Sequence, residues 1–275
     1  MSTVLSVENQ VSEQTEEQFY PAIMEGLRNP QEIVDIHSAL AFFERKTQLE
    51  NSEGKHWVYL GHCYFISQDL ERCYAIYQKC LYSLKEDTNP QLWYGIGLLY
   101  SKYNNWKYAE VAFLAALKIS PDFEEKGIIY SNLAKIYKNQ GHYENAEHYY
   151  KKAYELSASD LKLKAELLCN IGYCLELQNK NQEAVKVYKE VIKYQKNQEI
   201  LGSLARLYEK LGDAESASCC HKEFNSEKIA CAFNTKGIPN DIAQPIPQCY
   251  NPYMSSQHIY ALYCLQLSKN CLSFS

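Results

Sequence analysis

A pattern of large and small apolar residues recurs five times along this chain and leaves few folds open to it. The clearest copy begins at Trp93, carries Gly97 and Tyr100 at fixed spacings behind it, and continues with Ala109 and Phe113. Copies in the same register begin at positions 57, 130, 168 and 201, so that successive starts are 36, 37, 38 and 33 residues apart. Such a period, in a chain with only 11 glycines and 8 prolines in 275 residues, is typical of stacked helical hairpins.

The residue types at the recurring positions explain why each copy should form two antiparallel helices. A small residue in the first helix, such as Gly97, and another in the second, such as Ala109, let the two helices approach closely. We expect the aromatic residues to fill the space between successive hairpins. Since one hairpin cannot bury its apolar face alone, neighbouring hairpins must stack on one another.

This pattern resembles the tetratricopeptide repeat, whose regular period is 34 residues. The resemblance implies an all-α fold, a tetratricopeptide-repeat right-handed superhelical solenoid with a concave groove. Residues 54–224 are predicted to form five repeats and residues 17–53 a degenerate N-terminal repeat or cap. Residues 1–16 are polar and are expected to be disordered. Residues 225–275 are expected to be an irregular, proline-containing linker that could end in a capping helix.

Composition and motifs argue against several classes of function. The net charge is −5, so the phosphate contacts of a nucleic-acid-binding protein are not expected. The chain has no glycine-rich phosphate loop, no Gly-x-Ser-x-Gly and no His-Glu-x-x-His, which predicts no enzyme activity, no cofactor and no small-molecule substrate. No apolar run approaches the ~20 residues of a membrane span, and the first residues do not resemble a secretory signal, so we expect an intracellular protein without membrane contact.

The eleven cysteines do not form a recognisable metal site, because no two of them lie in a Cys-x-x-Cys pair. Cys73 and Cys80 occupy small-residue positions of the repeat, which favours buried thiols and no bound metal. A Cys/His nucleophile at Cys220 and His221 stays open, although nothing around these residues supports it.

The candidate functional surface is the concave groove, which the first helix of each repeat lines at fixed positions. In the first two repeats these positions are mainly apolar, and in the later repeats they carry mixed charge. An apolar trough of this kind suits the apolar face of a partner helix, with Phe65 and Tyr94 as leading anchors. The alternative is that the N-terminal helices cover part of it. The predicted partner-binding residues, called the apolar trough below, are Val58, His62, Phe65, Ile66, Tyr94 and Leu98.

Some stretches are more specific than the general repeat pattern, among them LGHCY at 60–64, LWYGIGLLY at 92–100 and IYKNQG at 136–141. They resemble the tetratricopeptide-repeat subunit of the fungal general transcriptional corepressor, the glucose-repression mediator family, in a truncated form. The resemblance covers roughly residues 40–215. The chain has fewer repeats than that family and lacks its long Gln/Ala-rich tail.

The resemblance implies a non-enzymatic adaptor in the nucleus that bridges DNA-bound transcription factors to a WD40 corepressor partner. In that family the early repeats receive a helical segment of the WD40 protein. Two other classes stay open: a scaffold subunit of another large assembly, such as a ubiquitin ligase or an RNA-processing complex, and a cochaperone. A cochaperone groove needs convergent Lys, Asn and Arg, where the first two repeats have Val58, His62 and Tyr94.

Overall fold

The structure is a computed structural model that describes residues 16–28, 36–49, 52–157, 160–194 and 198–223. The described part of the chain consists of helices and the turns between them, without a strand. It divides into two compact units, the first ending at Lys126 and the second beginning at Gly127. The all-α tetratricopeptide-repeat solenoid class expected from the sequence is therefore confirmed by the helical hairpins of both units.

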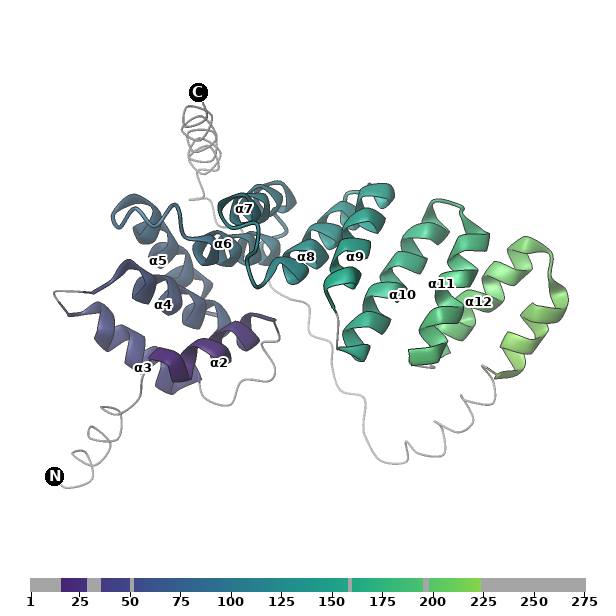
Figure 1. Ribbon diagram of the computed structural model, residues 1–275, viewed down its shortest axis with the longest axis horizontal. Helices are drawn as coiled ribbons and strands as arrows, with labels where there is room; N and C mark the ends of the chain where they lie inside the picture. The colour runs from purple at the N-terminus through teal and green to yellow at the C-terminus, as the bar shows by residue number, and fades with distance from the viewer. Residues whose placement is uncertain (1–15, 29–35, 50–51, 158–159, 195–197, 224–275) are drawn as a thin grey trace, which may run out of the picture. The chain divides into compact units, whose positions relative to one another are not determined.

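The helices follow one another as short antiparallel hairpins, coloured along the chain in Figure 1. Helices α4 with α5, α6 with α7, and α10 with α11 share the most extensive contacts. The helices are α2 (Glu16–Arg28), α3 (Ile36–Thr47), α4 (Gly54–Ile66), α5 (Leu70–Tyr82), α6 (Pro90–Lys102), α7 (Trp106–Ile119), α8 (Lys126–Asn139), α9 (Tyr143–Leu156), α10 (Leu161–Leu177), α11 (Asn181–Tyr194) and α12 (Gln198–Leu211), with a further helical stretch at 214–223.

One residue in the turn of each repeat has a left-handed backbone, and this residue recurs in register. These residues are Gln68, Asn104, Gly141, Asn179 and Gly212. Each lies 11 positions after the start of its repeat, since the repeats start at 57, 93, 130, 168 and 201. Glycine and asparagine adopt this conformation at the least steric cost. The recurrence supports the repeat register predicted from the sequence.

The spacing of small and aromatic residues that recurs along the chain brings two helices together within each hairpin. A Cβ atom on Gly97 would lie 2.5 Å from Cε1 of Phe113, and one on Gly172 would lie 2.7 Å from Cε1 of Tyr188. Each aromatic ring therefore lies against the small residue of its own hairpin. The repeat pattern predicts the rings between successive hairpins and does not predict this contact within one hairpin.

The ring of Tyr77 shows that the same residue can also reach the next hairpin. It packs against Gly61 in its own repeat, and a Cβ atom on Gly95 of α6 would lie 2.8 Å from its Cζ atom. Within the first unit, Gly95 therefore allows a close approach of α6 to α4 and α5 that the repeat pattern does not predict.

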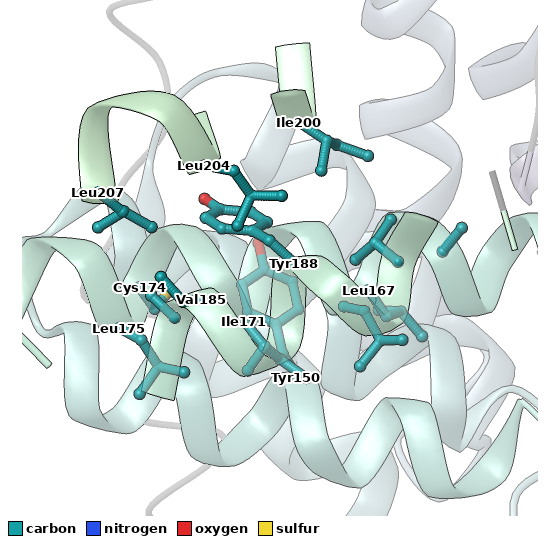
Figure 2. Close-up of a cluster of buried hydrophobic side chains, with 14 of the residues drawn as sticks. Tyr150, Leu167, Ile171, Cys174, Leu175, Val185, Tyr188, Ile200, Leu204 and Leu207 are labelled. Atoms are coloured by element: carbon teal, nitrogen blue, oxygen red, sulfur yellow. The ribbon is translucent and has the colours of Figure 1, made fainter. Parts of the chain in front are cut away.

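The core of the second unit takes most of its side chains from four consecutive helices, and Ala134 of α8 and Ala217 after α12 complete it. Figure 2 shows side chains of α9, α10, α11 and α12 meeting in one cluster, with Tyr150 and Tyr188 among them. Cys174 of α10 belongs to the same cluster, as a small apolar side chain would. Cys73 and Cys80 in the first unit are also buried.

Parts of the predicted domain organisation lie outside the described residues. These parts are residues 1–15 of the N-terminus and the whole linker 225–275. Between them, five hairpins occupy the range 54–224, the last formed by α12 and residues 214–223. The boundaries themselves stay predictions.

Candidate functional site

The residues of the apolar trough lie on the first helices of the first two repeats. Helix α4 carries four of them and helix α6 carries Tyr94 and Leu98. Five are buried, with exposed fractions between 0 and 6%, and Leu98 is half-buried. The structure thus shows no open trough at these positions, and their role in binding a partner stays a prediction.

Helix α2 covers the groove side of the first two repeats. Its Tyr20 ring lies 5.6 Å from the ring of Tyr59 on α4, and Gln91 of α6 donates a hydrogen bond of 2.9 Å to the Tyr20 hydroxyl. Gln91 occupies a position of the repeat that faces the concave side. Helix α2 therefore lies against a position that the repeat pattern assigns to the concave side, and Figure 1 shows it beside α3 and α4.

An ion pair between the exposed Arg28 and the buried Glu125 holds the C-terminal end of α2. The guanidinium group of Arg28 donates to both carboxylate oxygens of Glu125, at 2.6 Å and 3.0 Å. The Glu125 side chain is only 1% exposed, and its hydrogen bonds raise the pKa of Arg28. Such a two-pronged pair is among the stronger polar contacts in proteins, and a buried carboxylate left without it would be strongly destabilising. The contacts of α2 therefore extend from α3 and α4 to the residue just before α8.

The buried face of α2 consists of Phe19, Ile23, Met24 and Leu27. The ring of Phe19 lies 5.0 Å from that of Phe42 on α3. The four-residue spacing of Phe19, Ile23 and Leu27 is the sequence signal for this face. Sequence reasoning treated residues 17–53 as one degenerate repeat and missed the path of α2 across the first two repeats to Glu125.

His62 of the apolar trough makes its polar contact inside the repeat. Its Nδ1 atom lies 2.6 Å from the hydroxyl of Tyr77 on α5, and its Nε2 atom has no hydrogen-bond partner among the described residues. Complete burial lowers the pKa of His62 to about 3, so the ring is neutral at pH 7. The expected polar contact from His62 to a partner is therefore directed to Tyr77 in this structure.

Tyr94 also belongs to the packing of its own hairpin. Its ring centroid lies 6.3 Å from that of Phe113 and 6.1 Å from that of Phe123. Burial raises the pKa of Tyr94, the charge of Glu125 adds to this effect, and Arg28 opposes it. Tyr94 was expected to be an anchor for a partner helix, whereas here it is fully buried, and truncating it would open a cavity against Phe113.

The groove positions of the second unit are more open and carry mixed charge, as the sequence predicts. Lys138 of α8 donates a hydrogen bond of 2.9 Å to Asn170 of α10, and its ammonium group lies 5.8 Å from the centre of the Tyr173 ring. Tyr173 is 46% exposed. This face combines an exposed aromatic ring with polar groups that can bind a peptide.

The described residues contain few of the features that catalysis or metal binding needs. They include no group of three or more His, Cys, Asp or Glu side chains placed to hold a metal ion. The His221 ring lies 2.8 Å from Glu209, and burial raises the pKa of Cys220, which is opposite to what a nucleophilic thiolate requires. None of the helices in the described ranges is long and apolar enough to span a bilayer.

Comparisons with known proteins agree with the repeat architecture. The family profile described as "Tetratricopeptide repeat" matches residues 125–197. Among solved structures, YrrB, described as a TPR protein with an unusual peptide-binding site, superposes with a TM-score of 0.59 and 19% identity, over 71% of this chain and 98% of its own. At that identity the likeness concerns the fold alone.

Two curated relatives are general transcriptional corepressors. The chain is 40% identical over 92 residues to ssn6 of Schizosaccharomyces pombe, which is 34% of this chain and 8% of the relative. It is 44% identical over 87 residues to trfA of Dictyostelium discoideum, which is 32% of this chain and 6% of the relative. The chain thus matches less than a tenth of the length of either corepressor. Its fold is that of a tetratricopeptide-repeat solenoid, and about a third of the chain is similar in sequence to general transcriptional corepressors.

Proposed function

We propose that this protein is a non-enzymatic adaptor of a transcriptional corepressor complex in the nucleus. Its partners are a WD40 corepressor and DNA-bound transcription factors, which it holds through the groove of its repeats. The observation that carries the proposal is the identity of 40% and 44% to two corepressors over stretches of 92 and 87 residues. The repeat fold supports it, because stacked helical hairpins present long concave surfaces for protein ligands.

The groove of the first repeats suits a helical ligand, since α2 already lies there as a helix. A partner helix would take the place of α2 next to the apolar trough. Leu98 is the residue through which this can be tested most directly, because it is half-buried, whereas Val58, Phe65 and Tyr94 are buried in the repeats. The exposed ring of Tyr173 marks a second surface for a regulator in the second unit.

Binding to promoters requires a partner in this proposal. The chain has a net charge of −5, and its lysines lie near acidic neighbours, as Lys151 does beside Glu147 at 2.6 Å. A purified chain should therefore not shift a DNA duplex at physiological salt. Neither a cofactor nor a small-molecule substrate is part of the proposal.

The test is affinity purification of the tagged full chain from nuclei of its native cells, followed by mass spectrometry. A WD40 protein should co-purify, and Leu98→Glu should reduce its yield several-fold without changing helix content. Tyr82→Glu is the matched control, because Tyr82 is exposed on α5, a second helix of the repeat. Recovery of a cytoplasmic assembly without any WD40 protein would contradict the proposed function.

A further inference from the structure

Helix α2 does not pack as the first helix of a repeat. In the repeats of α4, α6 and α10 a glycine lies 16 positions before the aromatic residue that packs on it, as Gly97 does for Phe113. The residue 16 positions before Phe43 of α3 is Leu27. The pair of α2 and α3 therefore lacks, at the place opposite Phe43, the glycine that these three hairpins have against their aromatic ring.

The connection between α2 and α3 is also longer than the connection within a regular hairpin. Seven residues, 29–35, separate α2 from α3, whereas three residues separate α4 from α5 and three separate α6 from α7. The longer connection allows α2 to leave the hairpin arrangement. Its contacts with Tyr59 and Gln91 belong to two successive repeats, and its contact with Glu125 lies in the turn that follows the second repeat, as an extended ligand laid across them would do.

Helix α2 has features that weaken it as an isolated element. A helix of 13 residues is marginal in water, and Pro21 inside α2 removes one of its backbone hydrogen bonds. Its four buried apolar residues and Arg28 hold it in place. Elements of this kind open more readily than the helices they cover.

Glu125 determines which residue a helix that replaces α2 must carry. Its carboxylate is buried, so departure of Arg28 would leave a charge without its partner. A replacing helix regains this interaction only if it carries an arginine at the matching end. It must also carry apolar residues at the spacings of Phe19, Ile23 and Leu27.

We propose that α2 is an intramolecular occupant of the concave groove of the first two repeats. It competes with an external amphipathic helix that has the same chemistry, namely an aromatic residue, apolar residues four and eight positions later, and an arginine nine positions later. This inference rests on the proposed function, since the external helix belongs to a protein partner of the adaptor. Partner binding then requires α2 to leave the groove.

The first experiment uses the full chain and a fluorescent peptide of residues 16–28. In the Arg28→Glu chain, α2 loses its ion pair, so the wild-type peptide should bind at least tenfold more tightly than it binds the wild-type chain. A peptide with the same Arg28→Glu change should not bind. Glu25→Gln is the control chain, because Glu25 contacts the same Arg28 but is exposed, and it should bind the peptide as the wild-type chain does.

Two outcomes would overturn the inference. One is an Arg28→Glu chain that keeps its helix content and melting temperature and binds the peptide no more tightly than the wild-type chain. The other comes from hydrogen exchange of the wild-type chain, in which α2 should exchange at least tenfold faster than α4 and α6. Equal rates would show that α2 is an integral part of the core.

The peptide assay contains no corepressor, so it separates the two proposals. Tight peptide binding without a WD40 protein in the nuclear purification would remove the proposed function and leave α2 as the occupant of the groove. Co-purification of a WD40 protein together with no peptide binding would remove the competition and leave the adaptor function.

Discussion

Gly97→Ala tests the packing that defines each hairpin. A Cβ atom on Gly97 would lie 2.5, 2.6 and 2.9 Å from three atoms of the Phe113 ring. The favourable separation of two carbon atoms is about 3.5–4.0 Å, so the ring and the helix must separate by roughly 1 Å. Phe113 is fully buried and also contacts Tyr94, so it has no empty space to move into.

The size of the effect follows from two opposing contributions. Overpacking of a filled core costs roughly 1–3 kcal/mol. Alanine in place of glycine inside a helix stabilises by about 1 kcal/mol. We therefore expect Gly97→Ala to lower the free energy of unfolding by roughly 1–2 kcal/mol, with the steric cost exceeding the gain in helix propensity.

Gly127→Ala is the matched control, because it changes the same residue type in a helix without the steric conflict. Its Cβ atom would meet the Cβ atom of Leu156 at 3.5 Å, which is ordinary contact. This variant should be neutral or more stable by up to about 1 kcal/mol. Urea unfolding, followed by circular dichroism at 222 nm with an unchanged slope, measures both free energies.

The result that would refute this reasoning is a Gly97→Ala chain as stable as Gly127→Ala. It would mean that Phe113 does not lie against Gly97 and that the register is wrong. The double variant Gly97→Ala with Phe113→Leu provides a second check. Since the smaller side chain makes room for the new methyl group, the double variant should lose less stability than the sum of the two single changes.

Three further predictions concern protonation and thiol reactivity. Although burial opposes ionisation of Glu147, hydrogen bonds from Lys151 and Gln178 lower its pKa; Glu147→Gln should therefore destabilise at pH 7, with a difference in urea midpoint that narrows as the pH falls below about 4. Because burial lowers the pKa of His62 to about 3, only the unfolded chain takes up this proton between pH 6.5 and about 3. As the pH is lowered through that window, the free energy of unfolding should therefore decrease, by up to about 1.4 kcal/mol per pH unit. His62→Gln should lose this part of the slope. Among the described cysteines, the exposed Cys219 should be labelled by a thiol reagent before the buried thiols of α5, whose pKa burial raises, and peptide mass spectrometry would detect the reverse order.

The repeat architecture could be predicted because its determinants are local in the sequence. A glycine and an aromatic residue 16 positions apart, such as Gly97 and Phe113, lie within one hairpin. The left-handed turn residue falls 11 positions after each start, at Asn104 in the same hairpin. Their recurrence at a constant spacing determined the helix pairs and their register before any tertiary contact was known.

The candidate site could be predicted only in part. The repeat positions placed the residues of the apolar trough on the first helices of two hairpins, and these helices are α4 and α6. They could not show that His62 is bonded to Tyr77, or that Tyr94 packs on Phe113. Those contacts depend on how far each helix is rotated about its axis, which the spacing of a repeat determines only within about one residue.

The position of α2 was decided by the tertiary structure alone. The amphipathic spacing of Phe19, Ile23 and Leu27 shows that one face must be covered, but not which surface covers it. The surface is selected by contacts between residues far apart in the chain, 71 positions for Gln91 with Tyr20 and 97 for Arg28 with Glu125. Such pairs leave no periodic trace in the sequence, because each occurs once and its energy depends on a buried environment that exists only after the repeats have stacked.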